Sequence, residues 1–255
     1  MTDSHWQQLA VMLEQVAASG RTVDFWLRDD DAFQPSEPLD RLLSLVERYA
    51  VPVVVAVPPA QATDALAQRI DALAGINVAV HGWAHDNHAP PEEKKQELGP
   101  HRPRETVLAE LERGYLRLQS LFPTALVPML VPPWNRIDAG LLDGLPGIGF
   151  RVLSVFGPEK PAPLRLVNTH VDVMDWHGTR GCRDHASIVA DIVTRVRQVC
   201  GDVEGRADQT GRTIGLLTHH LVHDERVWAF LDRLFDMIAG HPACRWRTGR
   251  DLTGR

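Results

Sequence analysis

Two short stretches of the sequence combine residue types that bind metal ions and move protons. The first is "LRDDDAF", residues 27–33, in which Asp29, Asp30 and Asp31 directly follow an apolar run. Adjacent like charges repel, and a carboxylate close to a protein core is costly unless a positive partner compensates it. The stretch therefore requires a cationic partner nearby.

The second stretch, "HGWAH", places His81 and His85 four residues apart. One helical turn would bring both imidazoles onto one face. Two neutral imidazoles and one carboxylate, which "DDD" could supply, make a three-ligand site for Zn²⁺ or a similar ion and leave a position open for water. An isolated pair at this spacing is also typical of loop histidines bonded to backbone, and it is the acid cluster that favours a metal site.

Apolar, β-branched runs predict strands, and amphipathic patterns between them predict helices. We expect strands over 23–28, 51–58, 76–81, 126–132, 150–156, 164–173 and 213–220, and helices over 1–22, 38–50, 62–75, 104–122, 185–201 and 225–240. Alternating strands and helices imply parallel strands with right-handed crossovers. About seven such strands close or nearly close a barrel, so residues 1–255 are predicted to form a single α/β barrel domain.

Reactive residues of α/β barrels lie at the C-terminal ends of the strands. Most of the twelve histidines and several tryptophans fall at such predicted ends, in "HGWAHDNH", "PPWNR", "HVDVMDWHG" and "THHLVHD". The polar loop over 87–103 is too long for a simple connector. Loops of that length usually belong to a binding face, so we expect it on the active face.

Composition limits the partners and the compartment. The chain has 255 residues, 44% of them hydrophobic, and a net charge of −6 without a basic stripe, which argues against nucleic acid and anionic membranes as partners. No apolar run approaches the roughly 18 residues of a membrane span, and the first residues lack a secretory-signal pattern. Three widely spaced cysteines, Cys182, Cys200 and Cys244, argue against a disulfide framework, so we expect a cytoplasmic protein.

The order of these motifs resembles the polysaccharide deacetylase family, the NodB-homology or carbohydrate esterase family 4 group. Asp-Asp, His-x-x-x-His, Pro-aromatic, Asp-x-x-Asp-Trp and Leu-x-His run from Asp30 to His219, about three quarters of the chain. The resemblance implies a distorted (β/α)₇ barrel of the NodB-homology type. It also implies metal-dependent removal of acyl groups from amines, typically those of N-acetylated sugars.

The resemblance further implies roles for the matching residues. Asp30 would be the general base and His219 the general acid, oriented by Asp172. One divalent ion, Zn²⁺ in the first instance and otherwise Co²⁺, Ni²⁺ or Mn²⁺, would be held by Asp31, His81 and His85. The implied substrate-binding residues are Pro133, Trp134, Asn135 and Trp176. The backbone N–H of Trp134 would bind the oxyanion.

The sequence also departs from the family's pattern. Val131 stands where the family has an arginine that pairs with the base, and we expect Arg28 to supply that charge instead. Ala32 replaces a glycine. Asp29 has no inherited role, and a solvated or arginine-paired acid is expected there. A bulge in the last strand would exchange His219 with His220.

The resulting hypothesis is a metal-dependent amidohydrolase acting on a small-molecule amide or N-acetylated sugar. One alternative is a catalytically silent, metal-containing barrel that binds a carbohydrate or metabolite. Another is a hydrolase of a non-sugar linear or cyclic amide. Asp30 and His219 are both present, which favours catalysis, while the roles of Asp175 and His88 stay open.

Overall fold

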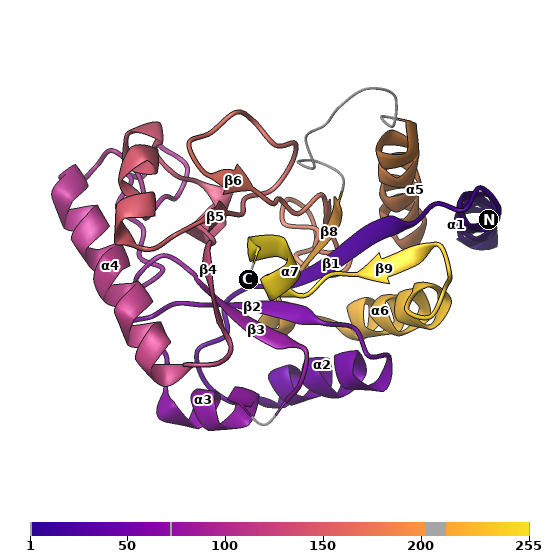
Figure 1. The fold of residues 1–255 in the computed structure, drawn as a ribbon, viewed down its shortest axis with the longest axis horizontal. Helices are drawn as coiled ribbons and strands as arrows, with labels where there is room; N and C mark the ends of the chain where they lie inside the picture. Colours follow the sequence, from indigo (N-terminus) through magenta and orange to yellow (C-terminus); the bar gives the residue numbers. More distant parts are fainter. Residues whose placement is uncertain (1, 72, 202–212, 255) are drawn as a thin grey trace.

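The computed structural model of the chain (Figure 1) describes residues 2–71, 73–201 and 213–254. Its parallel sheet has the strand order β6-β5-β4-β3-β2-β1-β8-β7, and β9 pairs with β1. The strands are β1 (Val23–Asp29), β2 (Val53–Val57), β3 (Ile76–Val80), β4 (Leu126–Leu130), β5 (Val152–Leu153), β6 (Arg165–Leu166), β7 (Val171–Asp172), β8 (Thr213–Thr218) and β9 (Cys244–Trp246).

The barrel closes through one bent segment. The predicted strand 164–173 is divided into β6, which pairs with β5, and β7, which pairs with β8. Between them the Asn168 side chain accepts from the N–H of Val155 and donates to the carbonyl of Gly157, beside a single parallel bridge between Phe156 and Thr169. Counting β6 and β7 as one strand, seven parallel strands surround the barrel, as the predicted distorted (β/α)₇ fold requires.

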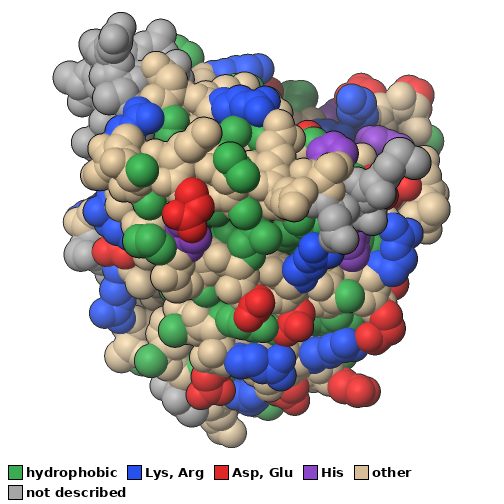
Figure 2. Space-filling view, turned by 90° about the vertical axis from the view of Figure 1, so that its right-hand side faces the viewer, with side chains coloured by type: hydrophobic (Ala, Val, Ile, Leu, Met, Phe, Trp, Pro, Cys, Tyr) green, Lys and Arg blue, Asp and Glu red, His purple; other side chains and the backbone are tan. Residues whose placement is uncertain are grey.

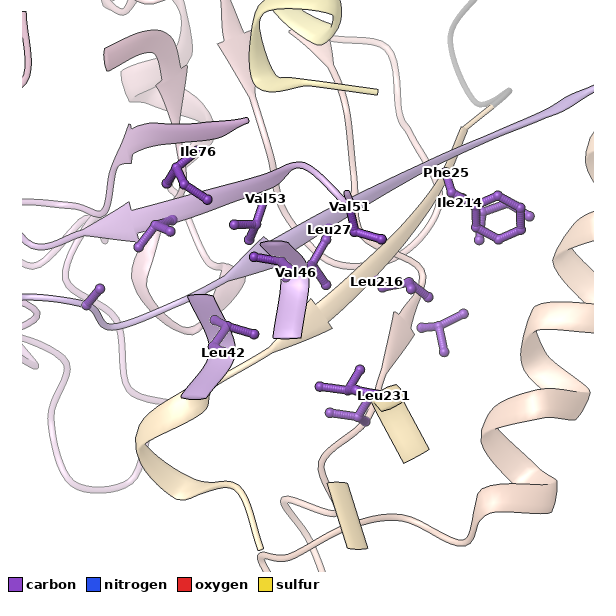
Figure 3. Close-up of a cluster of buried hydrophobic side chains, with 14 of the residues drawn as sticks. Phe25, Leu27, Leu42, Val46, Val51, Val53, Ile76, Ile214, Leu216 and Leu231 are labelled. Atoms are coloured by element: carbon purple, nitrogen blue, oxygen red, sulfur yellow. The ribbon is translucent and has the colours of Figure 1, made fainter. Parts of the chain in front are cut away.

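Side chains of the strands alternate between two apolar clusters. Along β2, Val54 and Ala56 point into the barrel, where they pack with Trp26. Val53, Val55 and Val57 belong to the larger cluster between the sheet and the helices. Figure 3 shows this outer cluster, with side chains of β1, β2 and β8 meeting α2 and α6. The same alternation continues to the end of β1, and it decides which acids enter the barrel.

The helices surround the sheet, and α1 lies beside α5 at the outside (Figure 1). Ser36 and Asp224 cap α2 and α6 by accepting the N–H groups of Leu39 and Val227. The α-helices are α1 (Thr2–Ala18), α2 (Glu37–Arg48), α3 (Asp64–Asp71), α4 (Arg104–Leu121), α5 (His185–Gly201), α6 (Glu225–Ile238) and α7 (Gly249–Thr253). Short 3₁₀ helices are η1 (Pro133–Asn135), η2 (Ala139–Gly144), η3 (Pro146–Ile148) and η4 (His220–Val222).

The sequence did not predict β9 and α7, which close the end of the barrel opposite the strand C-termini. A three-residue strand and a five-residue helix are too short to show a periodic pattern. Leu252 of α7 is buried in the inner cluster, and Gly249 lies so close to Asn77 that a Cβ would come within 2.9 Å of that side chain. Strand β5 is also shorter than the predicted 150–156.

None of the described helices combines the length and apolar character needed to cross a membrane. On the face drawn in Figure 2, acidic and basic side chains are interspersed.

Candidate active site

The three predicted metal ligands come together at the C-terminal ends of β1 and β3. Nε2 of His81 lies 3.1 Å and Nε2 of His85 lies 3.3 Å from Oδ1 of Asp31. Their ligand atoms all lie within 4.8 Å of one another, and this is the one such group in the described residues. Asp31 is far in sequence from the two histidines, so its approach to them is a consequence of the barrel.

The tautomer of His81 suits metal binding. Its Nδ1 lies 2.9 Å from the carbonyl oxygen of Val131, which can only accept, so Nδ1 carries the proton and Nε2 offers a lone pair. A backbone carbonyl on the far nitrogen is the usual way in which a protein orients a metal-binding histidine. Nε2 faces a carboxylate oxygen, and a cation or a proton must lie between them. The donor set therefore fits a divalent ion such as Zn²⁺.

Electrostatics couples these three groups. Burial favours the neutral acid, but the hydrogen bond and the charge of His81 bring the pKa of Asp31 well below its usual range. Burial likewise opposes the charge on His81, yet the hydrogen bond to Asp31 raises its pKa overall. For His85, burial and the neighbouring His81 lower the pKa.

Arg28 and Asp30 form a buried pair inside the mouth of the barrel, on the face of β1 that Trp26 also occupies. Nε of Arg28 lies 2.9 Å from one carboxylate oxygen of Asp30, and Nη2 donates to the other at 3.0 Å. Nη2 also donates to Oδ1 of Asn135, and Nη1 to Oγ of Ser154, at 2.7 and 2.8 Å. Arg28 thus occupies the place expected for it beside Asp30.

This arrangement predicts a strong dependence on the guanidinium group. A lysine at position 28 presents a single ammonium and cannot hold both oxygens of Asp30 while bonding Ser154 and Asn135. We expect Arg28→Lys to lower kcat by roughly ten- to hundred-fold, because the carboxylate is then misplaced. Arg41→Lys is the control, since its pair with Glu225 is exposed at the surface. Equal kcat values in both variants would contradict the assigned role of Arg28.

The predicted substrate-binding turn lies next to the metal ligands. The ring of Trp134 packs on His85 with centroids 4.4 Å apart, and Pro133 is buried against Gly82. Asn135 points its side-chain oxygen at Arg28. This contact within the site was not expected from the sequence, and substrate binding by Asn135 stays a prediction.

Left-handed backbone is concentrated here. Four of the six described non-glycine residues with positive φ belong to the site: Asp31, His85, Trp134 and Asn135. Each such conformation is costly for a side chain with a Cβ and persists only where the surroundings impose it. The turns that carry the candidate ligands are therefore held against their local preference.

His219 enters the site from the end of β8. Its Nε2 lies 3.8 Å from Oδ2 of Asp30, and its ring packs edge-on against Trp176, with centroids 4.7 Å apart. Asp172 was expected to orient His219, but among the described residues its carboxylate accepts instead from Nε1 of Trp176 and N–H of Met174. The indole of Trp176 thus lies between Asp172 and His219 in the chain of contacts, and burial raises the pKa of Asp172. The orienting role of Asp172 stays a prediction.

The environment predicted for Asp29 is wrong. Asp29 is neither solvated nor paired with arginine: it points to the outer face of β1, is fully buried and bonds Nδ1 of His220. Its other oxygen accepts from Oγ1 of Thr218 at 2.7 Å and N–H of His220 at 3.0 Å. Burial opposes the charge of Asp29, but His220 brings its pKa below the usual value. The pair fixes the turn that presents His219.

Two residues that the sequence left open lie outside the metal group. The His88 side chain is exposed and does not join Asp31, His81 and His85. Asp175 closes a turn by accepting the N–H groups of Gly178 and Thr179. Sequence reasoning also missed Ser154 and Glu97, which touch site residues from segments without a chemical motif.

His223 packs on Trp228, and its burial predicts that the fold loses stability in acid. Burial lowers its pKa to about 4, and its Nε2 accepts the N–H of His219. The unfolded chain takes up this proton near pH 6.5 and the folded chain does not, so folding loses stability as the pH falls from 6.5 to 4. We expect His223→Gln to reduce this loss by about 2 kcal/mol, less than the full shift because the ring is partly exposed. Urea unfolding across that range measures it, and equal losses would contradict it.

The whole fold, compared with solved structures, has counterparts among deacetylases. A protein from Mycobacterium smegmatis described as a polysaccharide deacetylase superposes with a TM-score of 0.65 and 18% identity, covering 91% of this chain and 89% of that one. The fold is that of the polysaccharide deacetylases. The expected resemblance is thus confirmed at the level of the fold.

Other structures with this fold extend the comparison. A family 4 carbohydrate esterase from Streptomyces lividans in complex with acetate gives a TM-score of 0.59 at 18% identity, covering 91% and 96% of the two chains. A family 4 acetyl xylan esterase from Clostridium thermocellum with a cobalt ion gives 0.54 at 14%, covering 91% and 92%. A mutant family 4 pseudoenzyme gives 0.58 at 11%, covering 88% and 65%. The sequence itself matches no protein-family profile and no curated protein.

Proposed function

We propose that this protein is a metal-dependent hydrolase that removes an acetyl or similar small acyl group from an amide nitrogen of a sugar or sugar-like molecule. The meeting of Asp31, His81 and His85 beside the Arg28–Asp30 pair carries this proposal. Asp31, His81 and His85 would hold the divalent ion, which would supply Lewis-acid chemistry for the activation of water and of the amide carbonyl. Zn²⁺ suits the donor set best, and Co²⁺, Ni²⁺ and Mn²⁺ are the alternatives.

The remaining residues divide the proton transfers. Asp30, held by Arg28, accepts the proton of the attacking water. His219 enters from the other side of the site and protonates the departing amine, with Trp176 and Asp172 fixing its ring. The backbone N–H of Trp134 is the proposed donor to the oxyanion, because its residue lies against His85 in a turn of positive φ.

The substrate class rests on the walls of the site. Trp134 and half-exposed Trp176 flank the candidate metal ligands and the acid, and aromatic rings of this kind stack on sugars or on other flat groups. If the protein works in the cytoplasm, which the three free cysteines favour, a small conjugate or precursor is a more plausible substrate than a cell-wall polymer.

A silent binding barrel is the second candidate, because a pseudoenzyme shares the fold. Loss of the general base or the general acid is the expected mark of a silent site. Asp30 and His219 are both present, and Nε2 of His219 lies 3.8 Å from Oδ2 of Asp30, which supports catalysis.

The test combines metal content with amine release. The purified wild type is expected to carry one divalent ion per chain and to release amine from at least one member of a panel of N-acetylated sugars, formyl amines and cyclic amides. Asp31→Ala and His85→Ala are expected to lose both ion and activity. His88→Ala, which changes an exposed histidine of the same loop, is the matched control. An ion retained in the first two variants would refute the ligand set.

A further inference from the structure

A buried carboxylate from the long loop over 87–103 holds the backbone between the two histidines. Glu97 is 1% exposed. Its Oε2 accepts the N–H of Trp83 at 3.1 Å, and its Oε1 accepts the N–H of Ala84 at 2.7 Å. Both amides lie within the "HGWAH" stretch, between His81 and His85.

The backbone around this carboxylate has no room for another side chain. Gly82 has a φ of +62°, and a Cβ there would lie 1.9 Å from Oε2 of Glu97 and 2.7 Å from Cγ of Pro133. The carboxylate fills the space beside the glycine. The stretch then bends so that His85, with a φ of 61°, turns its imidazole toward Asp31.

Glu97 is itself fixed by the other site loop. Its neighbour Leu98 accepts the N–H of Asp138 at 2.7 Å and bridges Ile137, and the carbonyl of Lys95 accepts from Arg136 at 2.8 Å. Residues 136–138 directly follow the turn that carries Trp134. The loop over 87–103 thereby ties the metal-ligand stretch to the turn proposed to bind substrate.

The two amides are the main partners of the carboxylate. Among the described residues Glu97 takes part in no ion pair, so its charge is stabilised by hydrogen bonds to Trp83 and Ala84. Breaking the hydrogen bonds between a buried carboxylate and backbone N–H groups costs free energy, because the carboxylate is left without partners. The same bonds hold the backbone of Trp83 and Ala84 in one conformation.

We propose that Glu97 is a positioning residue for the metal site, which sets the distance between His81 and His85 through the two amides that it binds. This inference rests on the proposed function, because it assumes that the two histidines hold an ion. Outer groups that orient metal ligands typically change metal affinity by ten- to hundred-fold when they are removed.

The test replaces Glu97 with glutamine, which has the same shape but turns an NH₂ group toward one of the two amide donors. We expect Glu97→Gln to weaken Zn²⁺ binding by about ten- to hundred-fold in competition with a chromogenic chelator. In the metal-free variant, the amide protons of Trp83 and Ala84 are expected to exchange faster with solvent. Glu93→Gln is the matched control, because its carboxylate lies on the same loop but is exposed and pairs with His101.

The outcomes separate the two claims. If the wild type binds Zn²⁺ and both variants bind it equally tightly with unchanged amide exchange, the positioning role is refuted and the metal site stands. If the wild type binds none of Zn²⁺, Co²⁺, Ni²⁺ and Mn²⁺, the proposed function fails together with the role of Glu97 in metal binding. Weakened binding only in Glu97→Gln, with the melting temperature of the variant close to that of the control, supports the inference.

Discussion

Asp30→Asn is expected to keep the bound ion and to lose about 10²- to 10⁴-fold in kcat, since an amide cannot accept the proton of the attacking water. The substitution keeps the size of the side chain and one oxygen that can still accept from Arg28. It changes none of the three candidate ligands, Asp31, His81 and His85. Steady-state kinetics on the best substrate of the panel, together with the metal content of the same preparation, measures both parts.

The control for this variant is Asp86→Asn, which removes an exposed acid beside His85. It is expected to leave kcat within about two-fold of the wild type, because a solvated charge at that distance is screened. Full turnover in Asp30→Asn would reassign the base. Asp29 could not take the role without a rearrangement, because its side chain lies on the outer face of β1 and is bonded to His220.

Asp29→Ala is expected to lower the free energy of unfolding by about 3 to 5 kcal/mol, because it leaves His220 and Thr218 buried without their shared acceptor. Asp29→Asn keeps one oxygen and is expected to fall between the alanine variant and the wild type. Chemical denaturation at neutral pH, monitored by tryptophan fluorescence, gives the three values.

Asp24→Ala provides the comparison on the same strand. Asp24 pairs with Arg245 and Arg247 near the surface, and loss of such a partly exposed pair is expected to cost about 1 kcal/mol. If Asp29→Ala cost no more than Asp24→Ala, the Asp29–His220 pair would not support the turn that follows His219. Activity should fall with stability only in the Asp29 variants.

The acid cluster shows how far the sequence could be interpreted. Side chains alternate along β1, so Arg28 and Asp30 point into the barrel and Asp29 points to the outer face. Opposite environments for the neighbouring acids Asp29 and Asp30 were therefore predictable. The partner of Asp29 was not: His220 belongs to a 3₁₀ turn after β8, whose path depends on how β8 and β1 pair. The sequence of one strand does not reveal which distant strand it pairs with or in which register.

The same limit explains what was missed elsewhere. The strand predicted over 164–173 is apolar enough to read as continuous, but closing the barrel requires it to leave β5 and reach β8, and Asn168 makes that bend. Glu97 looks like one more acid in a polar loop. Its importance depends on the loop folding back over Gly82, which no local pattern reveals.

The central claim is that Asp31, His81 and His85 hold a divalent ion, and X-ray diffraction on both sides of the zinc absorption edge tests it most directly. Crystals of the protein prepared with Zn²⁺ are expected to show a single strong anomalous peak bounded by Oδ1 of Asp31 and the Nε2 atoms of the two histidines. A map without a peak at that position, or with the ion bound elsewhere in the barrel, would contradict it.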